Sequence, residues 1–289
     1  MENITYGNVC EKTKFWQNAR FYTVFASFSA FFWLKFKFYI RQIIIYIPPD
    51  LTCFSSCAIL YSTRYFIASK EKIMIKTLVC IGDSITRGTF TAANEEAPLS
   101  IATFNYPKLL KNLLKARDLH EYGVNGISYC SLSPVQSREA LAKTCATFPA
   151  GNVTIVAAGT NDYGTSVPLG NFSDTEDISF YGAADLVFRT LKRLNEPNGN
   201  IFVLLPLPRR NEREKNGAGF VLADYRAALL KKAEKYSLFT IDGAKLAIDP
   251  YDTSETSLIF DGTHPNEQGH RLLAEFLFRE IENQLNSAK

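Results

Sequence analysis

The chain has 289 residues, of which 46% are hydrophobic and 21% are charged, and its formal net charge is +3. This length allows one sizeable α/β domain with an extension, or two small domains. Residues 1–73 carry the positive charge, with nine Lys and Arg against four Asp and Glu, whereas residues 74–289 contain 23 against 25. Because the nearly neutral part has no basic face, we expect no nucleic-acid partner.

The first 73 residues differ in composition from the rest, with ten of the 22 Phe but only one of the 16 Gly. Their uninterrupted apolar run, residues 21–34, spans only 14 residues, and Lys35, Lys37 and Arg41 follow it. Each basic residue near the middle of a membrane helix costs about 2.5 to 3.5 kcal/mol, so we expect no stable membrane span. A secretory signal is also disfavoured, because 20 mixed-charge residues precede the run and no Ala-x-Ala-like cleavage site follows it.

Met74 is the only methionine besides Met1, and it immediately precedes the first expected strand. We therefore expect translation to start at Met74. Residues 1–73 would then be an N-terminal extension that is disordered or not translated, and residues 74–289 would form the working domain. An interfacial membrane anchor is the alternative, and N-terminal sequencing of the native protein would distinguish the two.

The six cysteines do not follow the spacing of a secreted disulfide framework, which favours a reducing compartment and a cytoplasmic protein. A genuine anchor or signal in residues 1–73 would instead make the protein membrane-associated or secreted. Cys53 and Cys57 have no second Cys or His pair nearby, so we expect no metal site there.

A continuous apolar run at residues 77–81 predicts a strand that is buried on both faces, and small, turn-forming residues end it at Gly82-Asp83-Ser84. Ligands bind at the carboxyl ends of the strands in an open α/β sheet, so Ser84 stands where chemistry can take place. Gly-Asp-Ser is also ordinary turn chemistry, and by itself the motif favours a turn.

The next hundred residues alternate between helix and strand patterns. Residues 90–103 predict a loop long enough to be functional. A helix is expected from Tyr106, and its inward face would be formed by Leu109, Leu110, Leu113 and Leu114. A short strand at residues 121–124 ends in Asn125-Gly126, and Ser133-Pro134 predicts the cap of another helix.

The second half of the chain continues the alternation. In order, it predicts a strand at 152–158 ending in Gly159-x-Asn161-Asp162, a loop at 163–179, a helix at 183–194, a strand at 200–205, a helix at 220–236, a strand at 238–241, and Asp261-x-x-His264-Pro265 before an amphipathic C-terminal helix. Five strands separated by helices predict a mainly parallel sheet covered on both faces. No glycine-rich phosphate loop follows any strand, so nucleotide binding is not supported.

Three strand ends and one C-terminal segment bring a hydroxyl, a glycine turn, a side-chain amide and an Asp-His pair to one edge of the expected sheet. Acyl transfer needs such parts: a nucleophile, a base, an anion that orients the base, and donors for the oxyanion. Each part also has a simpler explanation, since His264 could lie on the surface, Asp261 could form a turn, Asn161 could cap a helix and Gly126 could fill a left-handed turn. One active site explains all four together.

The four blocks, Gly82-Asp83-Ser84, Gly126, Gly159-x-Asn161-Asp162 and Asp261-x-x-His264-Pro265, resemble those of the SGNH or GDSL-type hydrolases, in the same order and at comparable separations. The resemblance covers residues 75–285. It implies a three-layer α/β/α, flavodoxin-like fold with five parallel strands. It also implies an esterase or lipase-like hydrolase of small-molecule esters, without a metal or an organic cofactor.

The resemblance further implies a role for each motif residue. Ser84 would be the nucleophile, His264 the general base and acid, and Asp261 the residue that orients the imidazole. The oxyanion would be held by the backbone N–H groups of Ser84 and Gly126 and by the side-chain amide of Asn161. The supporting residues of the motifs, which would hold the turns, are Asp83, Gly159 and Asp162.

The loops at 90–103, 163–179 and 209–218 would form the substrate pocket, and none contains a block of aliphatic residues. This favours short acyl groups, such as acetyl on a carbohydrate or another polar molecule. Arg209, Arg210 and Arg213 could bind an anionic substrate, but the acidic residues between them favour a solvated loop. A lysophospholipase or thioesterase and a non-catalytic carbohydrate-binding module are the alternatives, and the sequence does not predict the oligomeric state.

Overall fold

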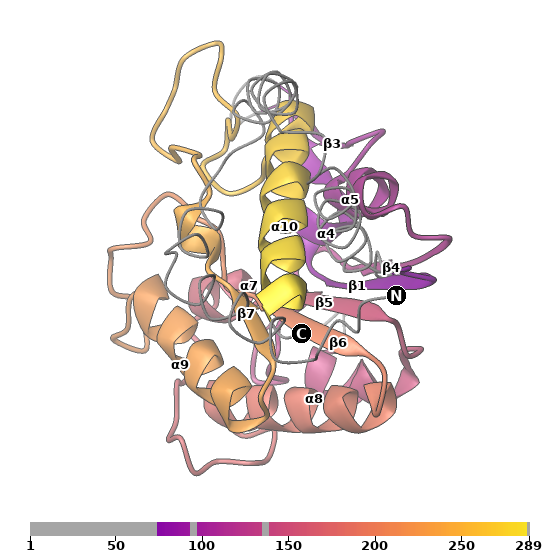
Figure 1. Ribbon diagram of the computed structural model, residues 1–289. Coiled ribbons are helices and arrows are strands. Elements are labelled where there is room, and N and C mark those ends of the chain that lie inside the picture. Colours follow the sequence, from indigo (N-terminus) through magenta and orange to yellow (C-terminus); the bar gives the residue numbers. More distant parts are fainter. Residues whose placement is uncertain (1–73, 93–96, 135–138, 288–289) are drawn as a thin grey trace, which may run out of the picture. The chain divides into compact units, whose positions relative to one another are not determined.

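The computed structural model describes residues 74–92, 97–134 and 139–287, and the expectations for residues 1–73 lie outside these ranges. Its main sheet has five parallel strands in the order β4-β1-β5-β6-β7 (Figure 1). The strands are β1 (Thr77–Gly82), β4 (Asp118–Gly123), β5 (Val153–Ala157), β6 (Asn200–Leu204) and β7 (Phe239–Ile241). Counted along the chain this order is 2-1-3-4-5, which is the flavodoxin-like order. The predicted fold class is confirmed.

The register aligns the carboxyl ends of the central strands. Gly82, the last residue of β1, pairs with Gly123 on one side and with Ala157 on the other. Ala157, which ends β5, pairs in turn with Leu204, the last residue of β6. The segments that follow these strands therefore begin side by side at one edge of the sheet.

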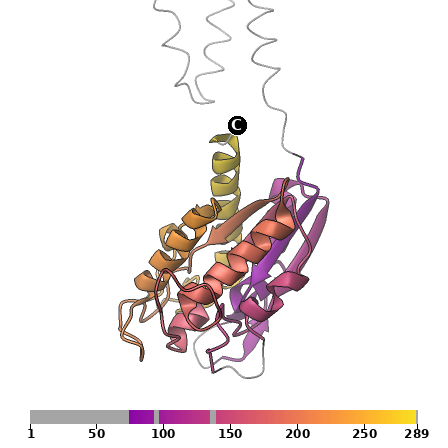
Figure 2. The same ribbon diagram turned by 90° about the horizontal axis from the view of Figure 1, so that it is seen from below.

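Helices cover both faces of the sheet. The core on one face joins Val79 and Ile81 to residues of α8 (Phe180–Asn195) and α9 (Leu222–Lys235). The core on the other face joins Leu78 and Cys80 to residues of α5 (Tyr106–Leu114) and α10 (Glu267–Ser287). Successive side chains of β1 alternate between these cores, as the period of two in a strand requires. Figure 2 shows α8 and α9 side by side across their face.

Helix α5 shows how local sequence sets an element and its buried face. Asn105 caps it by accepting a hydrogen bond from the Lys108 N–H, and a proline lies in its first turn. Tyr106, Leu110 and Leu114 repeat every four residues and are buried. Burial of each such leucine contributes about 1.5 to 3 kcal/mol. The prediction that Leu113 also faces inward is wrong, because the fourfold repeat turns it outward and it is 38% exposed.

Two further predictions need correction. Residues 90–103 are not only a loop, since β2 (Thr89–Thr91) and β3 (Leu99–Ile101) form an antiparallel pair there. Short strands of this kind leave little periodicity to detect. The cap predicted at Ser133-Pro134 is also wrong, because α6 (Leu141–Thr144) begins after Ala140.

Other predicted boundaries move by a few residues. Helix α8 begins at Phe180 and not at residue 183, because the Ser179 hydroxyl accepts a hydrogen bond from the Gly182 N–H and caps the helix there. Strand β4 begins three residues before its predicted start, at Asp118. Within the described part of the chain, no helix combines the length and the hydrophobicity needed to cross a membrane.

Candidate active site

Ser84 lies at the carboxyl end of β1, where it is the first residue of the short helix α4 (Ser84–Arg87). Asp83 caps this helix, because its Oδ1 accepts a hydrogen bond of 2.9 Å from the Ile85 N–H. The cap holds the turn in which Ser84 leaves the strand. Ser84 is only 6% exposed, so the surrounding residues cover most of its surface.

His264 and Asp261 approach this hydroxyl from the loop before α10. The Ser84 Oγ is 2.8 Å from His264 Nε2, and His264 Nδ1 is 2.6 Å from Asp261 Oδ2. Asp261 Oδ1 also accepts hydrogen bonds from the backbone N–H groups of Thr263 and His264, at 2.8 and 2.7 Å. Burial pushes the pKa of Asp261 upward, but the bonds from His264 outweigh it and hold the pKa below its ordinary value. The ionised carboxylate thus fixes both the loop and the ring.

The turn at Gly126 and the side-chain amide of Asn161 belong to two segments that contact each other. Gly126 has a φ of 76° and Gly159 a φ of 111°, and both values fall in the left-handed region that glycine adopts most readily. Gly159 precedes α7 (Thr160–Gly164), which places Asn161 in its first turn. The Asn161 Nδ2 donates a hydrogen bond of 2.8 Å to the carbonyl of Ile127. One N–H of this amide holds the 125–130 loop, and the other N–H remains for a further acceptor.

Asp162 also binds the 125–130 loop. Its two carboxylate oxygens accept hydrogen bonds from the N–H groups of Tyr129 and Cys130, at 2.9 and 3.0 Å. The side chain is fully buried, and burial raises its pKa to about 7. The motif residue Asp162 therefore has a positioning role, since both of its oxygens are used by the backbone.

The arginines after β6 are not all part of a solvated loop. Arg209 Nη1 donates to the carbonyl and to the hydroxyl of Thr160, at 3.0 and 3.1 Å, and its guanidinium lies 5.4 Å from the centre of the Tyr163 ring. Arg210 Nε donates to the carbonyl of Pro250 at 3.3 Å, and its backbone N–H donates to the carbonyl of Gly262. The expectation of a solvated loop is therefore wrong for these two residues and holds for Arg213, which is exposed.

The structure thus brings the predicted residues together in two groups. One is the hydrogen-bonded line from Ser84 through His264 to Asp261, which can move a proton from the hydroxyl to the imidazole. The other is the glycine turn held against Asn161, and the pairing of β1 with β5 places it beside the first group. Among the described residues, no group of three or more His, Cys, Asp or Glu side chains is arranged to hold a metal ion.

Comparison with known protein families assigns the chain to one of them. The model of the GDSL-like lipase/acylhydrolase family matches residues 80–272, which is more than half of the 289 residues. The chain belongs to this family. It is a hydrolase of ester bonds, and esters of small molecules are the substrates that the family indicates. The resemblance inferred from the four motif blocks is confirmed.

Solved structures share the fold of this GDSL hydrolase. A protein from Lactobacillus plantarum is 25% identical, with a TM-score of 0.59 over 74% of this chain and 98% of the other. An aryl esterase from M. smegmatis is 19% identical, with a TM-score of 0.55 over 72% and 99%. A carbohydrate acetylesterase from Sinorhizobium meliloti is 15% identical, with a TM-score of 0.52 over 72% and 99%. A search of curated proteins found no match.

The sequence did not predict a cavity that lies at the same edge of the sheet as the candidate site. Residues 204–207, at and directly after the end of β6, line this cavity together with Asp83, which precedes Ser84, and Thr160, which precedes Asn161. A strand that ends in leucine and proline residues has no motif that marks a pocket. Only the position of β6 next to β5 in the sheet could have suggested a cavity there.

Proposed function

We propose that Ser84, His264 and Asp261 form the catalytic triad of a carboxylic ester hydrolase. The observation that carries this proposal is the unbroken line of hydrogen bonds from the Ser84 hydroxyl through the imidazole to the Asp261 carboxylate, at 2.8 and 2.6 Å. In this arrangement Asp261 holds the Nδ1–H of the ring, so Nε2 is free to accept the proton of the hydroxyl.

In the first step the Ser84 Oγ attacks the ester carbonyl carbon, and its proton passes to His264 Nε2. The carbonyl oxygen becomes an oxyanion that accepts hydrogen bonds from the N–H groups of Ser84 and Gly126 and from the Asn161 amide. Such donors are each worth about 10² to 10³ in rate, because they face charge that develops only in the transition state. The bond to the alcohol oxygen then breaks, and His264 returns the proton to the leaving alcohol.

In the second step water attacks the acyl-enzyme. His264 Nε2 takes a proton from the water as its oxygen bonds to the acyl carbon, and the bond to Ser84 Oγ breaks. The proton then returns to Ser84 Oγ, which releases the carboxylic acid and regenerates the enzyme. His264 Nε2 thus carries the proton in both steps.

For the acyl group we propose acetyl or another short chain, carried on a carbohydrate or a similar polar molecule. The loops at 163–179 and 209–218 contain no aliphatic block that would line a long channel. The carbohydrate acetylesterase from Sinorhizobium meliloti has the same fold, so the fold is compatible with such a substrate.

A second candidate is an esterase of longer, lipid-type acyl chains. Leu99, Ile101 and Phe104, on β3 and just after it, are exposed by 61, 54 and 51%. The Thr103 N–H donates to Glu267, three residues after His264, so this apolar group lies near the histidine loop. Apolar side chains at such a position can bind an acyl chain.

The test compares hydrolysis of p-nitrophenyl acetate, butyrate and octanoate by the full chain and by its Ser84→Ala variant. We expect Ser84→Ala to keep the fold and to lose about 10³-fold or more in kcat, because only binding and the oxyanion donors remain. Ser287→Ala, at the exposed end of α10, is the matched control and should keep full activity and fluorophosphonate labelling.

The chain-length series separates the two candidates. A rate that falls steeply from acetate to octanoate supports short acyl groups, whereas a rate that rises supports lipid-type esters. Near wild-type turnover by Ser84→Ala would refute the triad.

A further inference from the structure

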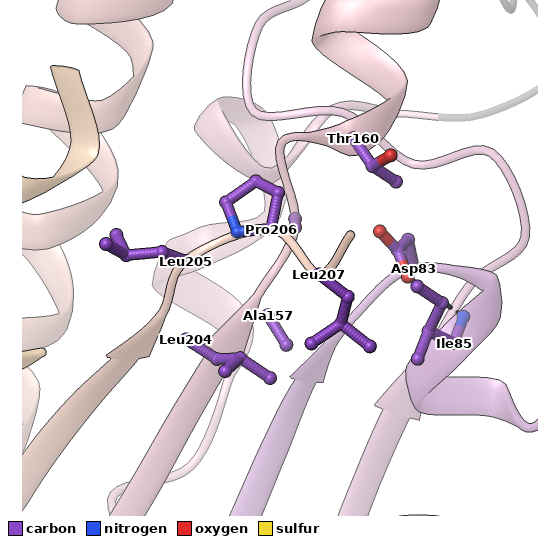
Figure 3. Close-up of a pocket in the computed structure, with 9 residues that line it drawn as sticks. Asp83, Ile85, Ala157, Thr160, Leu204, Leu205, Pro206 and Leu207 are labelled. Atoms are coloured by element: carbon purple, nitrogen blue, oxygen red, sulfur yellow. Dashed lines mark hydrogen bonds between the residues drawn. The ribbon is translucent and has the colours of Figure 1, made fainter. Parts of the chain in front are cut away.

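A small cavity lies at the carboxyl edge of the sheet, and Asp83, the residue before Ser84, is part of its lining (Figure 3). Its lining includes Asp83 and Ile85, which flank Ser84 in the chain, and Thr160, which directly precedes Asn161. The residues that would hold the acyl carbon and its oxyanion are therefore the immediate neighbours of the lining. Through these neighbours the cavity adjoins residues of both groups of the proposed site.

The chemistry of the lining is that of an apolar pocket. Seven of the nine lining residues are aliphatic or proline, and Asp83 and Thr160 are the other two. In Figure 3 the side chains of Leu207, Ala157 and Asp83 turn toward the same space. An apolar pocket with a few polar atoms at its edge favours a hydrocarbon group attached to a polar one.

The size of the cavity limits what can enter it. The centre of a water molecule can reach about 20 Å³ of its volume. Because an atom extends around its centre, the hollow itself is larger than this figure. The space therefore admits a hydrocarbon group of a few carbon atoms, which corresponds to a short acyl group and not to a long chain.

We infer that this cavity is the acyl pocket and that it selects esters of short acyl groups. The inference rests on the proposed function, since it assumes that the acyl-enzyme forms on Ser84. With the oxyanion turned toward Gly126 and Asn161, the alkyl end of the acyl group points between Thr160 and Leu207. The alcohol part of the ester stays outside, which leaves room for a large polar leaving group such as a sugar.

Leu207→Ala in the full chain tests the pocket by removing part of its wall. We expect the ratio of kcat/KM for p-nitrophenyl butyrate to that for acetate to rise at least tenfold. Leu246→Ala is the matched control, because Leu207 and Leu246 are buried leucines of the same core, 5 and 3% exposed, and only Leu207 lines the cavity. The control should lose similar stability and keep the wild-type ratio within about twofold, since a cavity left elsewhere in the core changes folding and not selectivity.

Ala157→Val narrows the same pocket, whereas Leu207→Ala widens it. It therefore tests the pocket even if Leu207→Ala does not fold. Two added methyl groups should lower the ratio of propionate to acetate turnover at least fivefold. Unchanged ratios in the folded variants would overturn the pocket and mean that the cavity holds only water. The wild-type enzyme would then still react with a fluorophosphonate at Ser84. Failure of that labelling would instead refute the proposed function.

Discussion

Lys232 offers a sharp test of how α8, α9 and the 163–179 loop are held together. Its ammonium is completely buried and donates hydrogen bonds of 2.8 Å to Asp185 Oδ1 and to the carbonyl of Asp174. It also lies 5.0 and 6.0 Å from the ring centres of Phe172 and Tyr181. Lys232→Met keeps the aliphatic stem and removes the charge, so it leaves a buried carboxylate with one partner fewer.

The magnitude follows from burial. Removal of one partner of a buried ion pair costs about 3 to 5 kcal/mol. Lys235 and Tyr236 still donate to the Asp185 carboxylate, at 2.6 and 2.8 Å, so we expect the lower end of this range, about 3 kcal/mol. For a domain of this size, about 2 to 4 °C of Tm is lost per kcal/mol, which predicts a decrease of about 6 to 12 °C.

Lys235→Met is the matched control, because Lys235 binds the same carboxylate oxygen but is 38% exposed. Exposed ion pairs contribute about 0.2 to 1 kcal/mol, so its Tm should fall by at most about 4 °C. Thermal unfolding followed by circular dichroism, with urea titration at 25 °C, measures both variants. Equal losses, or a larger loss in Lys235→Met, would refute the assignment of the stabilisation to the buried ammonium.

Two further predictions concern residues around Ser84. Burial raises the pKa of Asp83 to about 6, against about 3.9 in an unfolded chain, so the folded protein keeps a proton between pH 4 and 6 that the unfolded chain has released. This difference should contribute a fall in stability of about 3 kcal/mol as the pH rises through this window. Asp162, whose pKa burial raises to about 7, adds a fall of its own, so Asp83→Asn, which keeps an acceptor for Ile85, should remove the Asp83 part and leave the Asp162 part in urea titrations at pH 4.5 and 7.5. Arg209→Ala should lower kcat about tenfold or more, because it frees the turn that carries Asn161, and Arg209→Lys should restore part of the loss. Steady-state kinetics alongside Tm would show a role in stability alone if Tm falls and kcat does not.

Much of the fold was predictable because the information is local. Apolar runs such as residues 77–81 identify buried strands without knowledge of their partners, and three of the four motif blocks follow the strands within a few residues. The errors occur where local patterns are weak. The β2–β3 pair consists of three-residue strands, and α6 begins after Ala140, whose side chain makes no capping hydrogen bond.

The contacts that depend on distant parts of the chain were not predictable. Lys232 and Asp185 are 47 residues apart. In the sequence, each looks like an ordinary charged residue of an amphipathic helix. The sequence predicts that Arg209 belongs to a charged, solvated loop, and only the structure shows its contact with Thr160. The Leu207 side of the cavity forms only when β6 lies next to β5.

The order of residues along the chain is thus enough to specify five strands, the edge at which they end and the polar residues that follow them, because period, turn chemistry and strand length are properties of short segments. Tertiary packing decided the rest. It set the 2.8 Å between Ser84 and His264, which are 180 residues apart, and buried the carboxyl of Asp162 deeply enough to raise its pKa to about 7. It also left the cavity at the carboxyl edge of the sheet. Distances, desolvation and cavities depend on which segments meet, and these segments meet only when the sheet assembles.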